Sequence, residues 1–371
     1  MKKTSLFICL MTFILTSTAF AVPKGPCDEP KDVCCEEAVG PYAFSYPKDL
    51  GLACERGFNF YGEFLLMKGS EEGLDYAMSN ISTAANTWVF PLQVGKVEGF
   101  SSGSQEWDWR PGFRVGFGTN NTFDQFNIDI HWTYIRIKAN AQANNITGSG
   151  DFLPLFLPPI TNLNTFMLED ASARWSGDFN TIDISLGKGY HVSRYFISNP
   201  KFGVRAAWID QDMTFRYSFM TGDLNGVKVT AKNDYWAAGL LAGYDGQFIA
   251  SKNWSIYAKT LFSLLFGKFD ISQHAAWRTI STGPSSPQSY DVEDSFYSIQ
   301  PNAELGAGLA WSRSLNKGEH LLSIKVGYEF IHFWDQNQLR RFFDLDPASN
   351  DTVSRGDLSF NGFQFAINLD F

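Results

Sequence analysis

Charged residues are scarce in this chain, and long apolar runs are missing from most of it. Asp, Glu, Lys and Arg make up 19% of the 371 residues, below the share of about a quarter that soluble domains usually carry. No apolar run beyond the N-terminus approaches the roughly 20 residues that a transmembrane helix needs. Basic residues are outnumbered 30 to 39, and the net charge is −9. The sequence therefore excludes a helical membrane protein and argues against nucleic acid as a partner.

Aromatic residues, by contrast, are abundant. Phe, Trp and Tyr make up 16% of the chain, and hydrophobic residues 44%. This composition excludes a disordered chain, which has few aromatics and a low hydrophobicity. The mean hydropathy is nevertheless slightly negative, at −0.17. A chain that is rich in Phe and Trp but polar on average is best explained by two different surfaces.

The first 21 residues have the pattern of a secretory signal peptide. Lys2 and Lys3 form a positively charged start, residues 6–15 are mostly apolar, and Ala19-Phe20-Ala21 is a small-residue cleavage site. The apolar stretch is too short for a transmembrane anchor. We predict a signal peptide over residues 1–21, cleaved after Ala21, and export of the mature chain.

The cysteines of the mature chain all lie near its N-terminus, and none follows in the rest of the sequence. They are Cys27, Cys34, Cys35 and Cys54. In an oxidising compartment such a cluster favours disulfides, with three possible connectivities if all four pair. A zinc site is the alternative, but the spacing is not Cys-x-x-Cys. We predict a Cys-rich periplasmic segment over residues 22–56, with no metal and no cofactor.

From residue 57 onward, apolar and polar residues alternate, which is typical of strands with two different faces. The clearest case is the C-terminus, where Phe363, Phe365, Ile367, Leu369 and Phe371 share one parity. The apolar faces are about ten residues long, as in tilted membrane strands. Trp and Tyr gather near strand ends, as in interfacial girdles. The alternation therefore predicts membrane strands.

Short and long connectors alternate between these strands, as a bacterial barrel with short periplasmic turns and long outer loops requires. The sequence predicts an all-β, closed antiparallel transmembrane β-barrel over residues 57–371, with about ten strands and at most twelve. The expected strands are 57–68, 107–119, 122–139, 171–187, 200–219, 227–248, 252–271, 292–314, 318–337 and 355–371.

Three stretches leave the local structure open. Residues 86–94 form either an extra strand or an inward-folded loop. Residues 152–160 contain three prolines, which exclude a central strand, so we expect an ordered apolar loop. Between Trp208 and Met213 the apolar parity slips, which marks either a β-bulge or the point where the strand leaves lipid.

If the apolar parity faces lipid, the other parity faces the interior and is pore-lining, because charges are costly in lipid and tolerated in a wet lumen. The ten charged or titratable residues on it are Arg114, Asp129, His131, Asp183, Arg205, Asp245, Lys259, Glu304, Lys325 and Glu329. They form either a polar channel that tunes ion preference or a closed interior in which acids and bases pair. A ten-stranded barrel is only slightly wider than one that side chains fill.

Catalysis finds little support in the sequence. Asp129 and His131 lie two apart on one face, as half of a hydrolytic site could. The chain has no Gly-rich phosphate loop and no paired histidines with metal-ligand spacing. We predict that the protein is not an enzyme and has no catalytic residues.

Several stretches resemble the major outer membrane protein family shared by Legionella and the chlamydia-like bacteria. They are Gly57-Phe-Asn-Phe-Tyr-Gly-Glu-Phe-Leu, Trp109-Arg-Pro-Gly-Phe-Arg-Val-Gly-Phe-Gly, Gly203-Val-Arg-Ala-Ala-Trp-Ile, Leu264-Leu-Phe-Gly-Lys-Phe, Gly327-Tyr-Glu and the closing Phe-Gln-Phe-Ala-Ile-Asn-Leu-Asp-Phe. The resemblance implies an abundant, pore-forming envelope barrel. It also implies that the last strand, with Ile367, Leu369 and Phe371, carries the signal read by the barrel-insertion machinery.

The hypothesis from the sequence is an outer-membrane porin through which small hydrophilic solutes and ions diffuse. The alternative is a structural or adhesive barrel with a plugged lumen, acting through its outer loops and disulfide cross-linking. The expected partners are outer-membrane lipid, the barrel-insertion machinery, and a second copy or disulfide-linked envelope proteins.

Overall fold

The fold is that of a computed structural model of the chain. The residues it describes are 46–47, 57–80, 94–100, 107–120, 126–144, 152–156, 168–219, 224–279, 287–316, 319–342, 351–353 and 355–371. All of them belong to the second of two compact units, Pro41–Phe371. The predicted signal peptide, its cleavage site and the four candidate disulfide cysteines lie outside the described residues. The same holds for the possible extra strand at 86–94, except for Val94.

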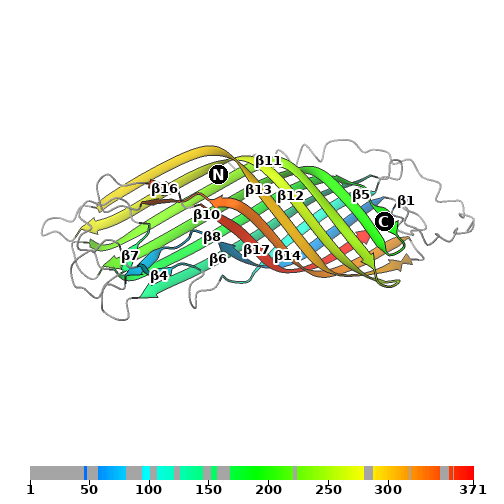
Figure 1. The fold of residues 1–371 in the computed structure, drawn as a ribbon, viewed down its shortest axis with the longest axis horizontal. Coiled ribbons are helices and arrows are strands. Elements are labelled where there is room, and N and C mark those ends of the chain that lie inside the picture. The colour runs from blue at the N-terminus through cyan, green and yellow to red at the C-terminus, as the bar shows by residue number, and fades with distance from the viewer. Residues whose placement is uncertain are drawn as a thin grey trace, which may run out of the picture. The chain divides into compact units, whose positions relative to one another are not determined.

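Ten long strands form the wall of the structure (Figure 1). They are β2 (Phe58–Glu71), β5 (Arg110–Asn120), β6 (Asn127–Asn144), β8 (Leu168–Gly187), β10 (Phe196–Phe219), β11 (Leu224–Ile249), β12 (Trp254–Thr279), β13 (Pro287–Leu315), β14 (His320–Asn337) and β17 (Gly356–Asp370). Each pairs antiparallel with its two neighbours in the order β10-β11-β12-β13-β14-β17-β2-β5-β6-β8, and β8 pairs back with β10. The sheet is therefore closed, and the predicted antiparallel barrel of ten strands is confirmed.

The first and last strands of the wall, β2 and β17, meet at the side of the short connectors. Phe371 donates its backbone N–H to the carbonyl of Phe58 at 2.8 Å and accepts one from Gly57 at 3.1 Å. β1 (Tyr46–Pro47) and β9 (Tyr190–Ser193) form a short extension of the sheet at this end, beside β10. No helix among the described residues is long and apolar enough to cross a membrane.

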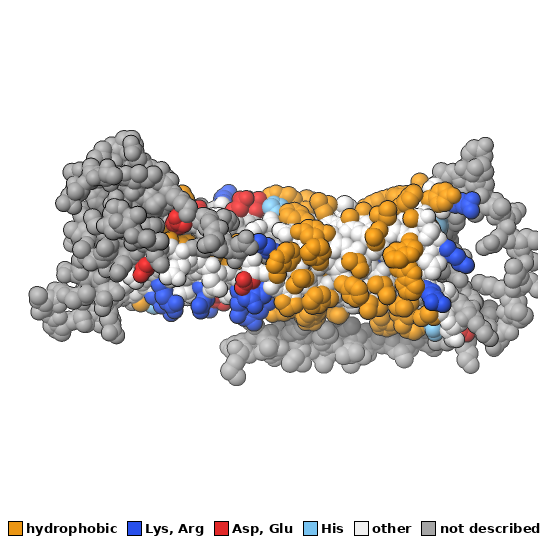
Figure 2. Space-filling model, turned by 90° about the horizontal axis from the view of Figure 1, so that it is seen from below, with side chains coloured by type: hydrophobic (Ala, Val, Ile, Leu, Met, Phe, Trp, Pro, Cys, Tyr) orange, Lys and Arg blue, Asp and Glu red, His pale blue; other side chains and the backbone are white. Residues whose placement is uncertain are grey.

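A band of apolar side chains covers the outer face of one part of the wall. It includes Phe64 on β2, Phe202 on β10, Leu240 on β11, Phe266 on β12 and Val326 on β14, each about half exposed or more. On the face that Figure 2 shows, hydrophobic side chains gather over the part of the barrel toward the C-terminal end, and most Lys, Arg, Asp and Glu lie on the other part. Such a band is the lipid-facing surface of a membrane barrel.

The strands continue well beyond this band. β10 to β13 are 24 to 29 residues long, whereas about 9–11 residues cross the hydrocarbon core. The connector after β10 and the one after β12 are consequently shorter than the sequence suggested. The long-connector end of the barrel is thus a water-exposed extension of the wall.

The polarity of the two faces reverses where the strands leave the band. On β10, Phe202 and Val204 face outward and Arg205 inward, but further along Asp212 faces outward and Phe215 inward. The pairing of β10 with β8 and β11 runs without a register shift across this point. The slip in parity between Trp208 and Met213 is therefore the exit of the strand from the apolar band and not a bulge.

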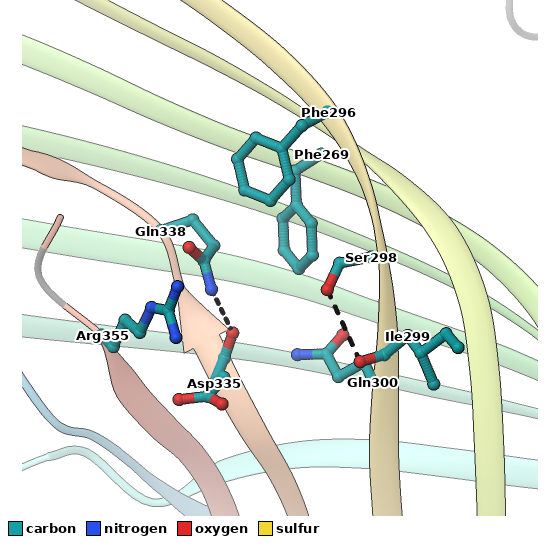
Figure 3. A pocket seen from close by; sticks show the side chains of 8 residues that line it. All are labelled: Phe269, Phe296, Ser298, Ile299, Gln300, Asp335, Gln338 and Arg355. Atoms are coloured by element: carbon teal, nitrogen blue, oxygen red, sulfur yellow. Dashed lines mark hydrogen bonds between the residues drawn. The ribbon is translucent and has the colours of Figure 1, made fainter.

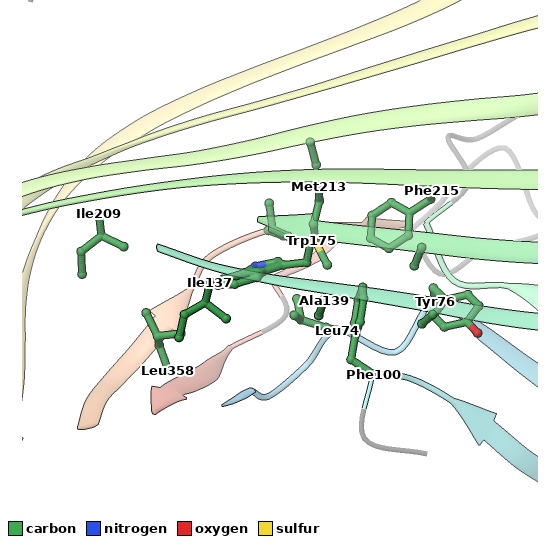
Figure 4. Packing of buried hydrophobic residues seen from close by; sticks show 14 of the residues in the cluster. Leu74, Tyr76, Phe100, Ile137, Ala139, Trp175, Ile209, Met213, Phe215 and Leu358 are labelled. Carbon is green, nitrogen blue, oxygen red and sulfur yellow. The ribbon is translucent and has the colours of Figure 1, made fainter. Parts of the chain in front are cut away.

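In the extension the interior is an apolar core. Ile137, Trp175, Met213 and Phe215 point inward from the wall, and Figure 4 shows Tyr76 among the residues that pack with them. An apolar core is expected here, because water surrounds the outside of the wall and the inside is the only place to bury apolar surface. The extension is therefore built like a soluble domain.

Segments between the wall strands fill this core. β3 (Ala77–Asn80) pairs with β4 (Val94–Glu98) and with β7 (Phe152–Pro154) in a small sheet. The Tyr217 hydroxyl on β10 holds the first segment by donating to the Tyr76 carbonyl at 2.8 Å. Trp107 packs against Trp175, with ring centroids 4.8 Å apart.

The expectation of a loop over 152–160 is wrong for its first residues. Phe152–Pro154 form β7, and Pro154 is accommodated because β7 is an edge strand of the small sheet. Phe156 then stacks on Phe215 of the wall with ring centroids 4.2 Å apart and is fully buried. Residues 152–156 therefore fold into the barrel.

Candidate functional site

Charged side chains fill the barrel interior at the level of the apolar band. Arg114 on β5 is the first centre of this network. Its Nε donates to the Thr133 hydroxyl at 2.8 Å, and its terminal nitrogens lie 2.7 Å from Glu63, 2.8 Å from Glu329 and 3.7 Å from Glu304. One guanidinium therefore joins carboxylates from β2, β13 and β14, and charge-assisted bonds of this kind are the strong ones.

Arg205 on β10 is the second centre. Its Nε donates to the Asp183 Oδ1 at 2.7 Å, its Nη2 reaches the other oxygen of the same carboxylate, and its Nη1 faces Glu304 and the Asn302 side chain. The contact with Asp183 is bidentate, which a planar guanidinium allows and a lysine does not. Because Glu304 contacts both arginines, the two centres form one connected network.

His131 on β6 extends the network from β8 to the neighbouring strand. Its Nδ1 lies 2.8 Å from Asp129, and its Nε2 lies 3.0 Å from Asp183. Asp129 also accepts a hydrogen bond from the Tyr61 hydroxyl at 3.1 Å. Both ring nitrogens are thus engaged by carboxylates.

The network crosses the lumen and does not merely run along the wall. Arg114 and Glu329 lie on β5 and β14, which are separated in the sheet by β2 and β17. Arg205 and Glu304 lie on β10 and β13, separated by β11 and β12. Such pairs meet only through the interior. Asp183 and Glu329 are 0% exposed, so at this level side chains fill the space that a channel needs.

The remaining sequence-predicted residues also face inward but lie at the margin of the network. Lys259 binds Glu329 at 2.9 Å. Asp245 binds Lys201 at 2.9 Å nearer the short-connector end. The Lys325 ammonium lies 5.7 Å from the Tyr257 ring centroid, a cation–π contact. All ten predicted residues therefore share the interior, and eight of them, all but Asp245 and Lys325, belong to the connected network.

Sequence reasoning missed four titratable interior partners. Glu63 and Tyr61 lie on β2, Lys201 on β10 and Tyr257 on β12. The sequence did carry a signal for these residues. Each of them lies on the same face of its strand as a predicted interior residue, or on the face opposite the apolar one. Tyr61 and Tyr257 were missed because an aromatic ring suits either face of a membrane strand.

Glycines make room for these side chains. A Cβ at Gly116 would lie 2.2 Å from the Tyr61 ring, and one at Gly306 would lie 2.8 Å from the Lys259 side chain. Both distances are too short for any other residue without displacing the neighbour. The glycines on the inner face therefore leave room for side chains from the neighbouring strands. Tyr61 and Lys259 lean across these glycines toward the centre of the barrel.

A second buried polar chain lies above the band, within the apolar core. The Gln211 side chain donates to Glu71 at 2.8 Å and accepts from the Asn233 amide at 2.8 Å, and this amide also donates to the Gln336 carbonyl at 2.8 Å. Glu71 is the last residue of β2 and lies beyond Lys68, the first charge on the outer face of that strand. Burial raises the pKa of Glu71 to about 8, which the hydrogen bond from Gln211 offsets only in part.

This shift makes the stability of the barrel depend on pH. The folded protein keeps a proton on Glu71 that the unfolded chain releases above its ordinary pKa of 4.5. The stabilisation is therefore complete below about pH 4.5 and is lost as the pH rises to 8, by up to about 5 kcal/mol. Glu71→Gln should flatten the free energy of unfolding between pH 5 and 8.5, measured by urea titration in lipid vesicles. Glu72→Gln, at an exposed neighbour, should keep the parent's pH dependence; equal curves for the two variants would contradict the assignment.

The closing strand presents its apolar parity to the outside. Ile367 is 47% exposed on the outer face of β17. The Phe371 ring packs against Phe60 with centroids 6.1 Å apart and against His320 at 5.1 Å. The role of Ile367, Leu369 and Phe371 in barrel insertion stays a prediction.

Within the described part of the chain, no group of three or more His, Cys, Asp or Glu is arranged to hold a metal ion. The charged interior is instead self-contained, with its carboxylates bound by arginine, lysine and histidine. Its ion pairs can hold two sides of the barrel together, and their separation would release the two sides.

The chain is similar to several solved structures. They include the outer membrane protease OmpT from Escherichia coli (9% identity, 85% of this chain and 97% of that chain, TM-score 0.38). They also include the CymD monoaromatic hydrocarbon channel (8% identity, 86% and 89%, TM-score 0.31) and a Pseudomonas aeruginosa FadL homologue (8% identity, 85% and 90%, TM-score 0.24). At these values none of the likenesses bears on function.

No curated protein matches the chain in sequence. One family model does, and it matches residues 53–371, which include the whole barrel. Its description, the Legionella pneumophila major outer membrane protein precursor, agrees with the resemblance seen in the strand sequences. The apolar band around the wall is what such a membrane location requires. The chain belongs to this major outer membrane protein family and is a β-barrel of the bacterial outer membrane.

Proposed function

We propose that the protein is a porin of the outer membrane that passes small hydrophilic solutes and ions, and that the network centred on Arg114 and Arg205 is its closed gate. The observation that carries this proposal is the contrast between the two halves of the interior. Above the apolar band the chain fills the barrel with apolar side chains such as Trp175 and Phe215. Within the band it fills the barrel with charges.

A purely structural barrel has no need of that contrast. Replacing buried ion pairs by well-packed apolar residues is often neutral or stabilising, so a buried salt bridge is weak evidence for stability. The upper interior demonstrates that this fold can be packed with apolar residues. Charges in the membrane zone are therefore best explained by a lumen that admits water and solute when the pairs separate.

The second candidate is a structural barrel with a permanently filled lumen. Two features favour it: Asp183, Glu304 and Glu329 are almost completely buried, and the segments around Tyr76 and Phe156 fill the outer part of the barrel. Its predicted cross-linking through the N-terminal cysteines lies outside the described residues.

Conductance in planar lipid bilayers separates the two candidates. Folded, heat-modifiable protein should give discrete conductance steps in KCl if it is a porin, because the ion pairs then open and close the lumen. A silent bilayer with folded protein in it would overturn the porin proposal and leave the structural barrel. Protein unfolded in urea before addition is the control for leakage that does not depend on the barrel.

We propose no catalytic role. His131 is the only histidine within the network, and its two ring nitrogens face Asp129 and Asp183. No ring nitrogen remains to activate a nucleophile. This arrangement supports a histidine that links two carboxylates across adjacent strands.

Export by the signal peptide, cleavage after Ala21, insertion by the barrel machinery and association with other envelope proteins all remain part of the proposal. The barrel would sit with its short connectors and both ends of the wall in the periplasm, as the even number of strands requires. The long-connector end, with the apolar core, would then face the medium.

A further inference from the structure

The barrel wall has a gap between β13 and β14 just above the apolar band. β13 pairs with β12 along the length from Pro287 to Trp311. Its pairing with β14 begins only at Asn302, opposite Phe333. Over residues 287–301, no strand among the described residues pairs with the second edge of β13.

The gap exists because β14 leaves the wall and turns into the lumen. Asp335 has a positive φ of 51°, and the register of β14 with β17 shifts between Phe333 and Asn337. The next residues are fully buried: Gln336 accepts from the Asn233 side chain, and Asn337 donates to the Glu72 carbonyl at 2.8 Å. Contacts with distant strands therefore hold β14 away from β13.

A pocket of about 80 Å³ occupies the gap, several times the volume that one water molecule requires. Phe269 and Gln300 line it from the inner face of the wall, where they are 1% and 2% exposed, and Ile299 lines it from the outer face, where it is 67% exposed. Figure 3 shows Arg355 and Gln338 on the β14–β17 side and the β13 residues across from them. The pocket therefore lies within the wall, bordered by buried residues and by Ile299, whose side chain is exposed.

The inner face of β13 connects the pocket with the charged network. Ser298, Gln300, Asn302 and Glu304 follow one another on the inward parity of this strand. Ser298 and Gln300 line the pocket, and Asn302 and Glu304 contact Arg205. A line of polar side chains therefore runs from the gap to the gate. The axial route from the long-connector end is instead filled by the apolar core, where a hydrophilic solute would lose its water without compensation.

A buried acceptor in the pocket has no partner. The Gln300 amide donates to the Trp334 carbonyl at 2.8 Å, but its Oε1 has no hydrogen-bond partner among the described residues. An unsatisfied buried acceptor costs free energy and calls for a ligand that donates a hydrogen bond. Water and small solutes with N–H or O–H groups are such ligands.

We propose that the gap between β13 and β14 is a lateral entrance through which water and small solutes with hydrogen-bond donors reach the polar lumen, with Gln300 as their first contact. The inference rests on the porin function for its physiological role. The presence of water in the gap can be tested without it.

Thiol reactivity tests the entrance directly. Gln300→Cys in the full chain, folded in lipid vesicles, should react with a small, permanently charged methanethiosulfonate within about tenfold of the rate of Ser295→Cys, which faces outward on the same strand. Peptide mass spectrometry assigns the label and separates it from the native cysteines. Adding Ser298→Trp, which fills the pocket, should slow the reaction of the cysteine at 300 at least tenfold. A cysteine at 300 that is inert, or whose rate is unchanged by the tryptophan, overturns the entrance.

Conductance separates failure of the entrance from failure of the porin function. If the parent conducts KCl, Ser298→Trp should reduce the conductance at least fivefold, while Ser295→Trp, with the same bulk on the outer face, should leave it unchanged. A conducting parent with no effect of Ser298→Trp overturns the entrance and keeps the porin. A silent parent whose cysteine at 300 reacts overturns the porin and keeps the hydrated gap.

Discussion

Arg205→Met is expected to lower the free energy of unfolding by about 3–5 kcal/mol. Arg205 is 2% exposed and neutralises Asp183 and Glu304, which are themselves buried. Removing one partner from a buried network leaves the other charges without compensation, and this is the costly way to break it. Urea unfolding in lipid vesicles measures the loss, and the temperature at which the folded band disappears in gels should fall with it.

The matched control for this variant is Arg136→Met. Arg136 also pairs with an aspartate on a neighbouring strand, Asp178 at 3.3 Å, but the two side chains are 53% and 36% exposed. Exposed pairs contribute about 0–1 kcal/mol, so this change should be nearly neutral. Adding Asp183→Asn to Arg205→Met should recover part of the lost stability, because one of the orphaned charges disappears. If Arg205→Met and Arg136→Met unfold at the same urea concentration, the network does not fasten the barrel.

Glu329→Gln is expected to raise the open probability of the channel at least tenfold. Glu329 binds Arg114 at 2.8 Å and Lys259 at 2.9 Å and so joins β14 to strands on two other sides of the lumen. Hydrogen bonds to charged groups contribute about 1.5–3 kcal/mol each, and about 1.4 kcal/mol is a tenfold change in an equilibrium. Single-channel recording measures the change, and the reversal potential in a KCl gradient should move toward anions as a negative charge is lost.

The control for the open probability is Glu293→Gln, which removes the same charge from the exposed outer face of β13. It should leave both the open probability and the reversal potential at the parent's values. If the Glu329→Gln protein stays folded but conducts no better than the parent, the structural barrel is favoured. The lumen would then remain filled although two ion pairs of the proposed gate had been removed.

The barrel has a charged interior in the membrane zone and an apolar interior in the extension. In the membrane zone the outside is apolar and the inside charged, as in β10 around Arg205. In the extension the outside is charged and the inside apolar, as in the same strand around Phe215. The hydrogen-bonded pairing of β10 continues without a break through both zones. The outer face of a single strand therefore passes from lipid to water halfway along its length. A composition that is aromatic yet polar on average follows directly from this design.

The sequence by itself determined the barrel. Strand alternation has a period of two residues, so the face on which Arg114, Asp183 or Glu329 lies follows from local parity once the apolar side is identified. The number of wall strands and the side of the short connectors follow from the spacing of these patterns. The inward placement of all ten predicted residues is of this local kind.

Only the tertiary structure decided which of these residues meet. Arg114 reaches Glu329 across two intervening strands, and such pairing depends on the tilt and stagger of the closed sheet, which local periodicity does not contain. The gap beside Gln300 has the same origin, because contacts from Asn233 and Glu72, far away in the chain, draw the end of β14 out of the wall. Parity is a property of each strand alone, whereas a gate and an entrance require several strands to close around one interior.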